Sequence, residues 1–147
     1  MAQEPHWIQL ADEQATLDFG GSLLEPLQEN LPVVYLQGDL GAGKTTLVRG
    51  LLRAAGYRGA VRSPTYTLME PYELAKFRLY HFDLYRLENP DELEFIGGRD
   101  YLGDAAIRML EWPERAAGWL PPADLLIRMQ VVGNARQISL QWQNAEA

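Results

Sequence analysis

The feature that most constrains this chain is the stretch at residues 38–46, which reads GDLGAGKTT. It matches G-x-x-x-x-G-K-[ST], the pattern of a phosphate-binding loop (P-loop) that joins a strand to a helix. An apolar run at residues 31–37 precedes it and is suited to a buried parallel strand. Residues 44–55 follow it, with apolar residues repeating on one helical face. Both flanks therefore support a strand–loop–helix unit that holds phosphate groups.

The residue types of this loop suit the binding of a nucleotide. Glycines let the backbone curl so that successive N–H groups point at phosphate oxygens, and the helix N-terminus adds the positive end of its dipole. Lys44 supplies a cation for the β- and γ-phosphates, and the Thr45 hydroxyl is placed to bind Mg²⁺. The predicted phosphate-binding residues are Gly38, Asp39, Leu40, Gly41, Ala42, Gly43, Lys44, Thr45 and Thr46. A glycine-rich turn that only connects two elements is the alternative, and the complete motif argues against it.

Composition excludes several classes of protein. The 147 residues are expected to form one domain, and the absence of cysteine excludes disulfides, thiolate metal sites and cysteine catalysis. Residues 1–5 lack the basic and apolar segments of a signal peptide, and no apolar run approaches the ~18 residues of a membrane span. We therefore expect a cytoplasmic protein without membrane association.

The net charge of −7 bears on the partners of the chain. Proteins that grip nucleic acid on their own usually carry a basic face, because phosphate contacts dominate that affinity. Here the 13 Lys and Arg residues are scattered along the sequence. Independent nucleic-acid binding is therefore disfavoured, and any action on RNA is expected to go through a partner.

The rest of the sequence predicts further strands and helices of an α/β protein. Strands are predicted over residues 6–10, 31–37, 67–74, 77–83, 107–111, 124–132 and 136–142, the last two as a closing antiparallel hairpin. Helices are predicted over residues 13–27, 44–55 and 91–96, with a further turn at 99–102. Asp12 and Asn89 are the expected N-caps of the first and third helices. Residues 143–147 are expected to be frayed.

Two acidic residues follow apolar strands in the Walker B manner. Asp83 ends the strand at residues 77–83, and Glu111 ends the strand at residues 107–111. A carboxylate at such a strand end can reach Mg²⁺ directly or through water. The pattern alone does not rank the two, and either could be an ordinary solvated acid.

A hydroxyl-rich loop lies between the P-loop helix and the next strand. It contains Ser63, Pro64, Thr65 and Tyr66. The proline keeps the preceding serine out of helical geometry, so the segment is loop or extended chain. On these residues alone a surface turn is the favoured interpretation.

Four spaced stretches together resemble a known family. They are GDLGAGKTT at residues 38–46, SPTYTL at 63–68, HFDLYRL at 81–87 and EWPE at 111–114. In this order they resemble the TsaE (YjeE) family, the small bacterial ATPases of tRNA threonylcarbamoyladenosine biosynthesis. The resemblance covers nearly the whole chain, and it is looser at the N-terminus and in the final hairpin.

The resemblance implies a P-loop NTPase fold whose mixed sheet has parallel core strands, antiparallel hairpins and flanking helices. It implies a role beside the threonylcarbamoyl transferase TsaD and its partner TsaB. That pair modifies adenosine 37 of tRNAs that read codons starting with A. The small ATPase is expected to drive turnover of this assembly, and to meet tRNA only indirectly.

The resemblance also assigns roles to residues of the motifs. It implies that Thr45 and Glu111 bind Mg²⁺, that Lys44 and the loop amides hold the phosphates of ATP, and that Asp83 is needed for activity. It favours a switch-like loop at residues 63–66 that senses the γ-phosphate or the partner. Only this analogy, and not the pattern of the strands, separates the two acids.

The identity of the nucleotide is a separate question. No N-K-x-D segment that would read guanine is present in the sequence, so adenine is expected to be preferred. Nucleotide contacts of the family near the first helix and the last hairpin would fall around Glu13 and Arg136.

Two other functions remain as alternatives at this point. A small-molecule kinase would need an acceptor pocket and usually an arginine-bearing lid, and no arginine-rich insertion is present. A nucleotide-clamped scaffold would need ATP binding but no hydrolysis. Arg62 and Arg86 are the candidates in this chain for an arginine finger, the cation that stabilises the transferred phosphate, but each is favoured as a surface or partner contact. We therefore expect a slow ATPase that a partner accelerates.

Overall fold

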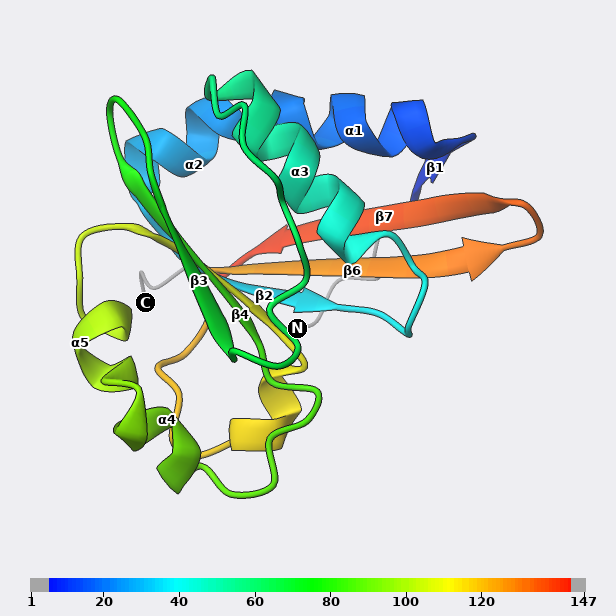
Figure 1. Ribbon diagram of the computed structural model, residues 1–147. Helices are drawn as coiled ribbons and strands as arrows, with labels where there is room; N and C mark the ends of the chain where they lie inside the picture. The colour runs from blue at the N-terminus through cyan, green and yellow to red at the C-terminus, as the bar shows by residue number, and fades with distance from the viewer. Residues whose placement is uncertain (1–5, 144–147) are drawn as a thin grey trace.

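One seven-stranded sheet runs through the computed structural model, which describes residues 6–143 (Figure 1). Its strands lie in the order β1-β7-β6-β2-β5-β4-β3. The strands are β1 (Ile8–Leu10), β2 (Val33–Gln37), β3 (Met69–Glu73), β4 (Arg78–Asp83), β5 (Ile107–Glu111), β6 (Leu125–Val132) and β7 (Ala135–Trp142). The helices are α1 (Glu13–Ser22), α2 (Leu24–Asn30), α3 (Lys44–Ala54), α4 (Asp91–Phe95), α5 (Gly98–Leu102) and the 3₁₀ turn η1 (Pro113–Ala116).

The centre of the sheet is parallel and its edges are antiparallel. β2 pairs in parallel with β5 and β6, and β4 pairs in parallel with β5. The antiparallel pairs are β3 with β4, β6 with β7 and β1 with β7. The predicted mixed sheet with parallel core strands, antiparallel hairpins and flanking helices is therefore confirmed. None of the helices over residues 6–143 is long and apolar enough to cross a membrane.

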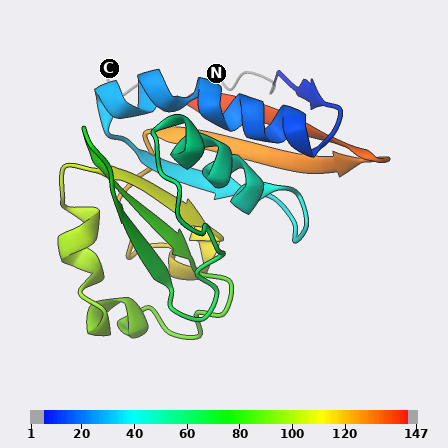
Figure 2. The ribbon, with the colours of Figure 1, turned by 45° about the horizontal axis from the view of Figure 1, so that its top comes forward.

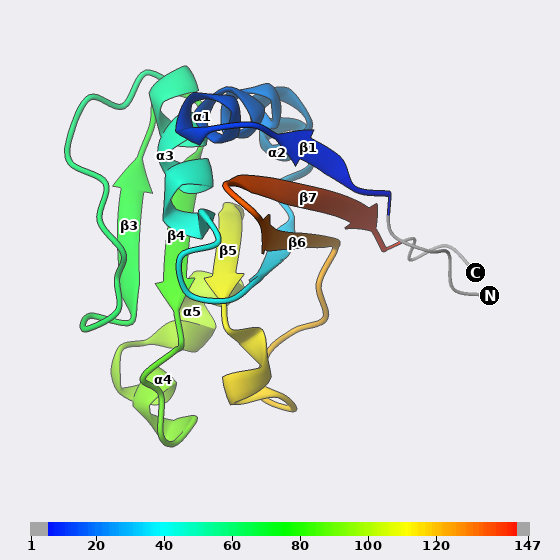
Figure 3. The same cartoon turned by 90° about the vertical axis from the view of Figure 1, so that its right-hand side faces the viewer.

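Helices cover both faces of the sheet, because the central strands bury apolar side chains on both sides. α1, α2 and α3 lie over one face, while α4, α5 and η1 lie on the other side (Figures 2 and 3). Alternate residues of β4 and β5 enter the two apolar cores. Leu79 and Met109 join the core with α3, whereas Phe82 and Leu110 join the core with α4 and α5.

Two glycines let α1 and α3 cross closely. A Cβ atom on Gly20 would lie 2.2 Å from the Leu47 carbonyl oxygen, and one on Gly50 would lie 2.1 Å from the Leu17 carbonyl oxygen. Any larger residue at either position would collide with backbone of the other helix. Gly20 has a low intrinsic preference for helix, yet it is a packing position of this crossing.

The prediction of one helix over residues 13–27 is wrong. The chain forms α1 and α2 with a break at Leu23, whose N–H bonds the Gly20 carbonyl oxygen at 3.1 Å in a tighter turn. Pro26 accounts for the break, because in a continuous helix its ring would clash with the Ser22 carbonyl group and its missing N–H would leave that carbonyl unpaired. Leu23 and Leu27 still reach the core beneath these helices.

The other predicted elements are present, with ends that differ from the predicted ones by at most about two residues. Asp12 caps α1 as expected, since its Oδ1 accepts a hydrogen bond from the Ala15 N–H at 2.9 Å. Asn89 accepts one from the Asp91 N–H at 2.9 Å at the start of α4. Gln143 is not frayed, because its N–H bonds the Asp124 carbonyl oxygen at 2.8 Å. The rest of the predicted frayed end, and the first five residues, lie outside the described residues.

Candidate functional site

A cleft of about 640 Å³ opens where β4 and β5 end, beside the N-terminus of α3 and the start of α1. Ligands of open α/β sheets bind at this edge, outside the carboxyl ends of parallel strands. The predicted site residues that line the cleft are Glu13, Leu40, Gly41, Gly43, Lys44, Thr45, Thr46, Ser63, Thr65, Tyr66, Asp83, Glu111 and Arg136. Those that do not line it are Gly38, Asp39, Ala42 and Pro64.

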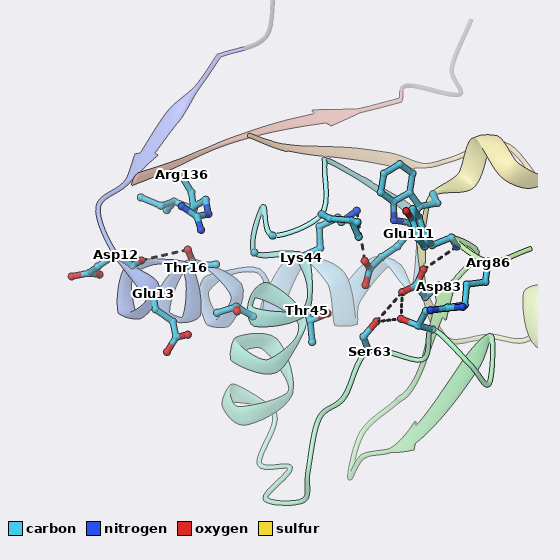
Figure 4. A pocket seen from close by; sticks show the side chains of 18 of the residues that line it. Asp12, Glu13, Thr16, Lys44, Thr45, Ser63, Asp83, Arg86, Glu111 and Arg136 are labelled. Carbon is cyan, nitrogen blue, oxygen red and sulfur yellow. Dashed lines mark hydrogen bonds and ion pairs between the residues drawn. The ribbon is translucent and has the colours of Figure 1, made fainter. Parts of the chain in front are cut away.

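The lining residues occupy two ends and a middle (Figure 4). Glu13 and Arg136 lie at one end, Asp83 and Glu111 at the other, and Lys44 lies between them (Figure 4). Arg136 donates from Nη1 to the carbonyl oxygen of its neighbour Ala135 at 3.2 Å. The cleft is therefore acidic at the strand ends and of mixed charge at the far end.

The P-loop begins α3 in the expected way. Gly43 precedes the helix with φ 103°, a left-handed conformation that residues with a Cβ rarely adopt. The Leu47 N–H bonds the Gly43 carbonyl oxygen at 2.9 Å and starts the helical ladder. Lys44, Thr45 and Thr46 form the first turn of α3, where backbone N–H groups have no partner within the helix, and all three line the cleft, an arrangement that suits an anion.

Lys44 is buried, with 5% of its side chain exposed. Its Nζ donates to the Gly38 carbonyl oxygen at 2.5 Å, lies 3.7 Å from Glu111 Oε1, and sits 4.2 Å above the centre of the Trp112 ring. Burial lowers the pKa of Lys44, and the nearby carboxylates of Glu111 and Asp83 oppose that shift. The cation is thus held by a carbonyl group, a carboxylate and an aromatic face.

Both carboxylate oxygens of Asp83 accept hydrogen bonds from other groups of the chain. Its Oδ2 accepts hydrogen bonds from Ser63 Oγ at 2.8 Å and Thr65 Oγ1 at 3.0 Å, and its Oδ1 accepts one from the Tyr85 N–H at 3.0 Å. The hydroxyl-rich loop is a turn, as its residues alone predicted, yet its hydroxyl groups point inward at this carboxylate. The loop is therefore coupled to the end of β4.

Glu111 lies beside Asp83 because the two residues are register partners across β5 and β4. Its side chain is buried, and its Oε2 lies 2.6 Å from His81 Nε2. Its Oε1 faces Lys44. Both Walker B candidates thus reach one cleft, which the pattern of either strand alone did not indicate.

The donors at this end of the cleft fit Mg²⁺, the metal that the family implies. Mg²⁺ prefers oxygen ligands and is commonly held by one or two carboxylates together with substrate phosphates. Thr45, Asp83 and Glu111 supply a hydroxyl group and two carboxylates to the same cleft. Within residues 6–143 no group of three or more His, Cys, Asp or Glu side chains could hold a metal alone.

Several cleft residues were missed by the sequence interpretation. Trp112 stacks over Lys44 and lies 5.0 Å from the Tyr85 ring, with a left-handed backbone at φ 59°. Its place directly after a strand-end acid was the available signal in the sequence. Thr16 and Asn134 also line the cleft, and nothing in their local sequence marks them.

Arg86 and Tyr66 form a pair at the rim. The Arg86 guanidinium lies 4.5 Å from the centre of the Tyr66 ring, and its Nη2 donates to the Tyr66 hydroxyl at 3.2 Å. Tyr66 is 82% exposed. An aromatic ring this exposed beside a guanidinium group gives the rim of the cleft both apolar and cationic character.

Comparisons with known proteins agree with this arrangement. A TsaE of Haemophilus influenzae, described as a tRNA threonylcarbamoyladenosine biosynthesis protein, is 50% identical over 135 residues, covering 89% of this chain and 85% of that one. One of Synechocystis is 45% identical over 113 residues, covering 72% and 69%. The crystal structure of Bacillus subtilis YdiB has the same fold, with a TM-score of 0.71 at 24% identity over 97% of this chain and 90% of that one.

The family comparison spans most of the chain. Residues 10–138 match the family described as threonylcarbamoyl adenosine biosynthesis protein TsaE. This range includes the P-loop, both strand-end acids and the loop that binds Asp83. The chain therefore belongs to the TsaE family of proteins of tRNA threonylcarbamoyladenosine biosynthesis.

Proposed function

We propose that the chain is the ATP-hydrolysing subunit of threonylcarbamoylation at adenosine 37, in tRNAs that read codons starting with A. It binds Mg-ATP in the cleft and drives turnover of the transferase TsaD with its partner TsaB. Family membership supports the pathway, and the geometry of the cleft supports the chemistry. The 147 residues act as one domain, in the cytoplasm, where the tRNA substrate is found.

The observation that carries the proposal is the position of Lys44. Its Nζ lies 3.7 Å from the Glu111 carboxylate, and it stands at the start of α3, whose first-turn residues line the same cleft. Burial of a cation is costly unless the cation is paired, and the nearby carboxylate of Glu111 offsets part of that cost. Phosphate groups are the partners that P-loop lysines bind. The Lys44 ammonium and the amides of residues 38–46 hold the β- and γ-phosphates.

The two acids have different roles in the proposed reaction. Thr45 and Glu111 hold Mg²⁺, which neutralises charge on the phosphates when it is bound. Asp83 already accepts three hydrogen bonds from its own chain, so it orients the attacking water or the loop at residues 63–66. Asp83 couples that loop to the end of β4 through Ser63 and Thr65, and loss of its carboxylate therefore impairs hydrolysis.

The partner supplies what the chain lacks. An arginine finger can contribute on the order of 10³–10⁵ in rate, and Arg86 is engaged by Tyr66 at the rim. The exposed Tyr66 and Leu40 flank the cleft and give the transferase pair a surface to contact. With a net charge of −7, the chain leaves tRNA binding to that pair.

The deciding experiment measures phosphate release from ATP by the chain alone and with purified TsaD and TsaB. We expect slow release alone and a large acceleration by the pair. Equal rates with and without the pair would contradict partner activation. Transfer of phosphate to a small acceptor would indicate a kinase, and full tRNA modification with a non-hydrolysable ATP analogue would indicate a scaffold.

A further inference from the structure

His81 is a buried polar side chain with no role in the chemistry described so far. It lies in β4 with 0% of its surface exposed, two residues before Asp83 and on the same face of the sheet. Its Nε2 lies 2.6 Å from Glu111 Oε2. It does not line the cleft, so any effect on a bound nucleotide must pass through Glu111.

The surroundings of the ring determine which nitrogen carries the proton. Nδ1 is buried and has no hydrogen-bond partner within the described part of the chain. If Nε2 carried no proton, its lone pair would face a carboxylate oxygen at 2.6 Å, which is repulsive. Nε2 therefore carries the proton and donates a hydrogen bond to Glu111 Oε2, which is the one polar contact of the ring within the described residues.

The hydrogen bond separates the two oxygens of Glu111. Oε2 is held by the buried His81 ring, whereas Oε1 faces the cleft at 3.7 Å from Lys44 Nζ. Asp83 differs, because both of its oxygens are occupied by donors of its own chain. A buried carboxylate without a partner for its inner oxygen would turn toward other donors or be expelled toward water.

We propose that His81 is a positioning residue that anchors Glu111 so that Oε1 is presented to the metal ion of the bound nucleotide. The inference rests on the proposed function, because it takes Glu111 as a metal ligand. Donors that hold a ligating group in this way commonly change metal affinity or activity by about 10- to 100-fold when they are removed. Packing by itself does not account for a histidine at this position, since within residues 6–143 its buried Nδ1 has no hydrogen-bond partner.

Three substitutions of His81 separate anchoring from packing. His81→Leu removes the donor, and His81→Asn keeps an amide group but draws it back from Glu111. His81→Gln carries an amide N–H out to about the position of Nε2, and should restore the hydrogen bond. Phe82→Leu is the matched control, because Phe82 is the next residue of β4, equally buried, and belongs to the core on the opposite face.

The measurement is the affinity for a non-hydrolysable ATP analogue, by calorimetric titration with Mg²⁺ and with EDTA. The dissociation constant in EDTA divided by the dissociation constant in Mg²⁺ gives the gain in affinity that the metal provides, independently of turnover. We expect His81→Leu and His81→Asn to reduce this ratio at least about 10-fold, with the affinity in EDTA unchanged. His81→Gln should bring this ratio most of the way back to the wild-type value. Phe82→Leu should lower the melting temperature of the protein but leave the ratio at the wild-type value.

The outcomes separate this inference from the proposed function. A wild-type protein whose binding gains nothing from Mg²⁺ would overturn both. If the wild type shows the gain and His81→Asn keeps it, only the anchoring role is overturned. The same holds if Phe82→Leu reduces the ratio as much as His81→Leu, or if His81→Gln recovers nothing while remaining folded. Should His81→Leu fail to fold, the comparison of His81→Asn with His81→Gln decides on the anchoring role.

Discussion

At the scale of single residues, the cleft is a balance of buried charges. Lys44, Asp83 and Glu111 are each at most 5% exposed, an environment in which an unpaired charge is strongly disfavoured. Each therefore has polar partners: a carbonyl group for Lys44, two hydroxyls and an amide for Asp83, and a histidine for Glu111. An incoming phosphate group offers Lys44 a stronger partner than a neutral carbonyl oxygen.

The first prediction concerns Lys44→Ala. Charge-assisted hydrogen bonds contribute about 1.5–3 kcal/mol each, so the affinity for ATP should fall roughly 10- to 100-fold or more. Circular dichroism should still show a folded protein, and calorimetric titration measures the affinity. Lys76→Ala is the control, because it removes the same charge from an exposed position between β3 and β4. Unchanged ATP affinity and turnover in folded Lys44→Ala would contradict the ATPase assignment.

The second prediction separates the two acids. Glu111→Gln should weaken binding of Mg-ATP more than binding of ATP in EDTA, because Oε1 is the carboxylate oxygen left facing the cleft. Asp83→Asn should leave Mg²⁺-dependent affinity within a few-fold and lower turnover, because its partners are Ser63, Thr65 and the Tyr85 amide. Titrations in Mg²⁺ and in EDTA, with phosphate release, measure both effects. The opposite pattern would assign the metal to Asp83.

At the scale of elements, the position of the P-loop depends on how α3 is seated. α3 lies against α1, and the close approach of the two backbones depends on Gly20 and Gly50. β4 and β5 place their acids on the same face because both strands alternate with a period of two and run in parallel. The helix crossing and the strand register together bring the loop amides and the carboxylates to one cleft.

The third prediction tests this crossing. Gly50→Ala and Gly20→Ala should each destabilise the protein by about 1–3 kcal/mol or more, because a Cβ would overlap a backbone carbonyl oxygen of the other helix. Gly21→Ala is the matched control in α1, since its Cβ would meet Ala54 Cβ at an ordinary 3.4 Å. That change should be neutral or stabilise by up to about 1 kcal/mol, as alanine favours helix. Urea unfolding measures all three, and equal effects would refute the crossing argument.

At the scale of the whole molecule, the cleft gathers segments from nearly the entire chain. Glu13 near the start and Arg136 near the end lie at one end of it, and the strand-end acids lie at the other. The loop at residues 63–66 connects the interior to the surface, because Thr65 bonds Asp83 while the neighbouring Tyr66 is 82% exposed. A partner that docks on this loop can therefore influence the carboxylate at the end of β4.

The fourth prediction concerns that coupling. Thr65→Ala and Tyr66→Ala should reduce acceleration by the transferase pair about 10-fold or more, with ATP affinity changed only a few-fold, since such order–disorder loops respond to partner and phosphate together. Phosphate release with and without the pair, and titration of ATP, measure the two quantities. Phe95→Ala is the control, because Phe95 is equally exposed but belongs to α4, outside the cleft. Intact acceleration in both loop variants would refute the docking role.

Local pattern in the sequence determined the elements and the residue types at their ends. The complete P-loop motif, the apolar strands that end in Asp83 and Glu111, and the caps at Asp12 and Asn89 each depend on residues close together in the chain. Such short-range rules predict an element, its face and its boundaries to within a few residues. They failed at the break near Leu23, where Pro26 was overlooked, although the rule for proline would have found it.

Strand order and long-range packing were decided only by the tertiary structure. No local rule places β4 beside β5, yet that pairing makes Asp83 and Glu111 neighbours and leaves His81 within hydrogen-bond distance of Glu111. The stacking of Trp112 over Lys44 joins segments far apart in the chain in the same way. Sequence periodicity specifies which face of a strand is apolar, whereas the contacts between distant strands depend on how all the apolar faces are buried together in one sheet.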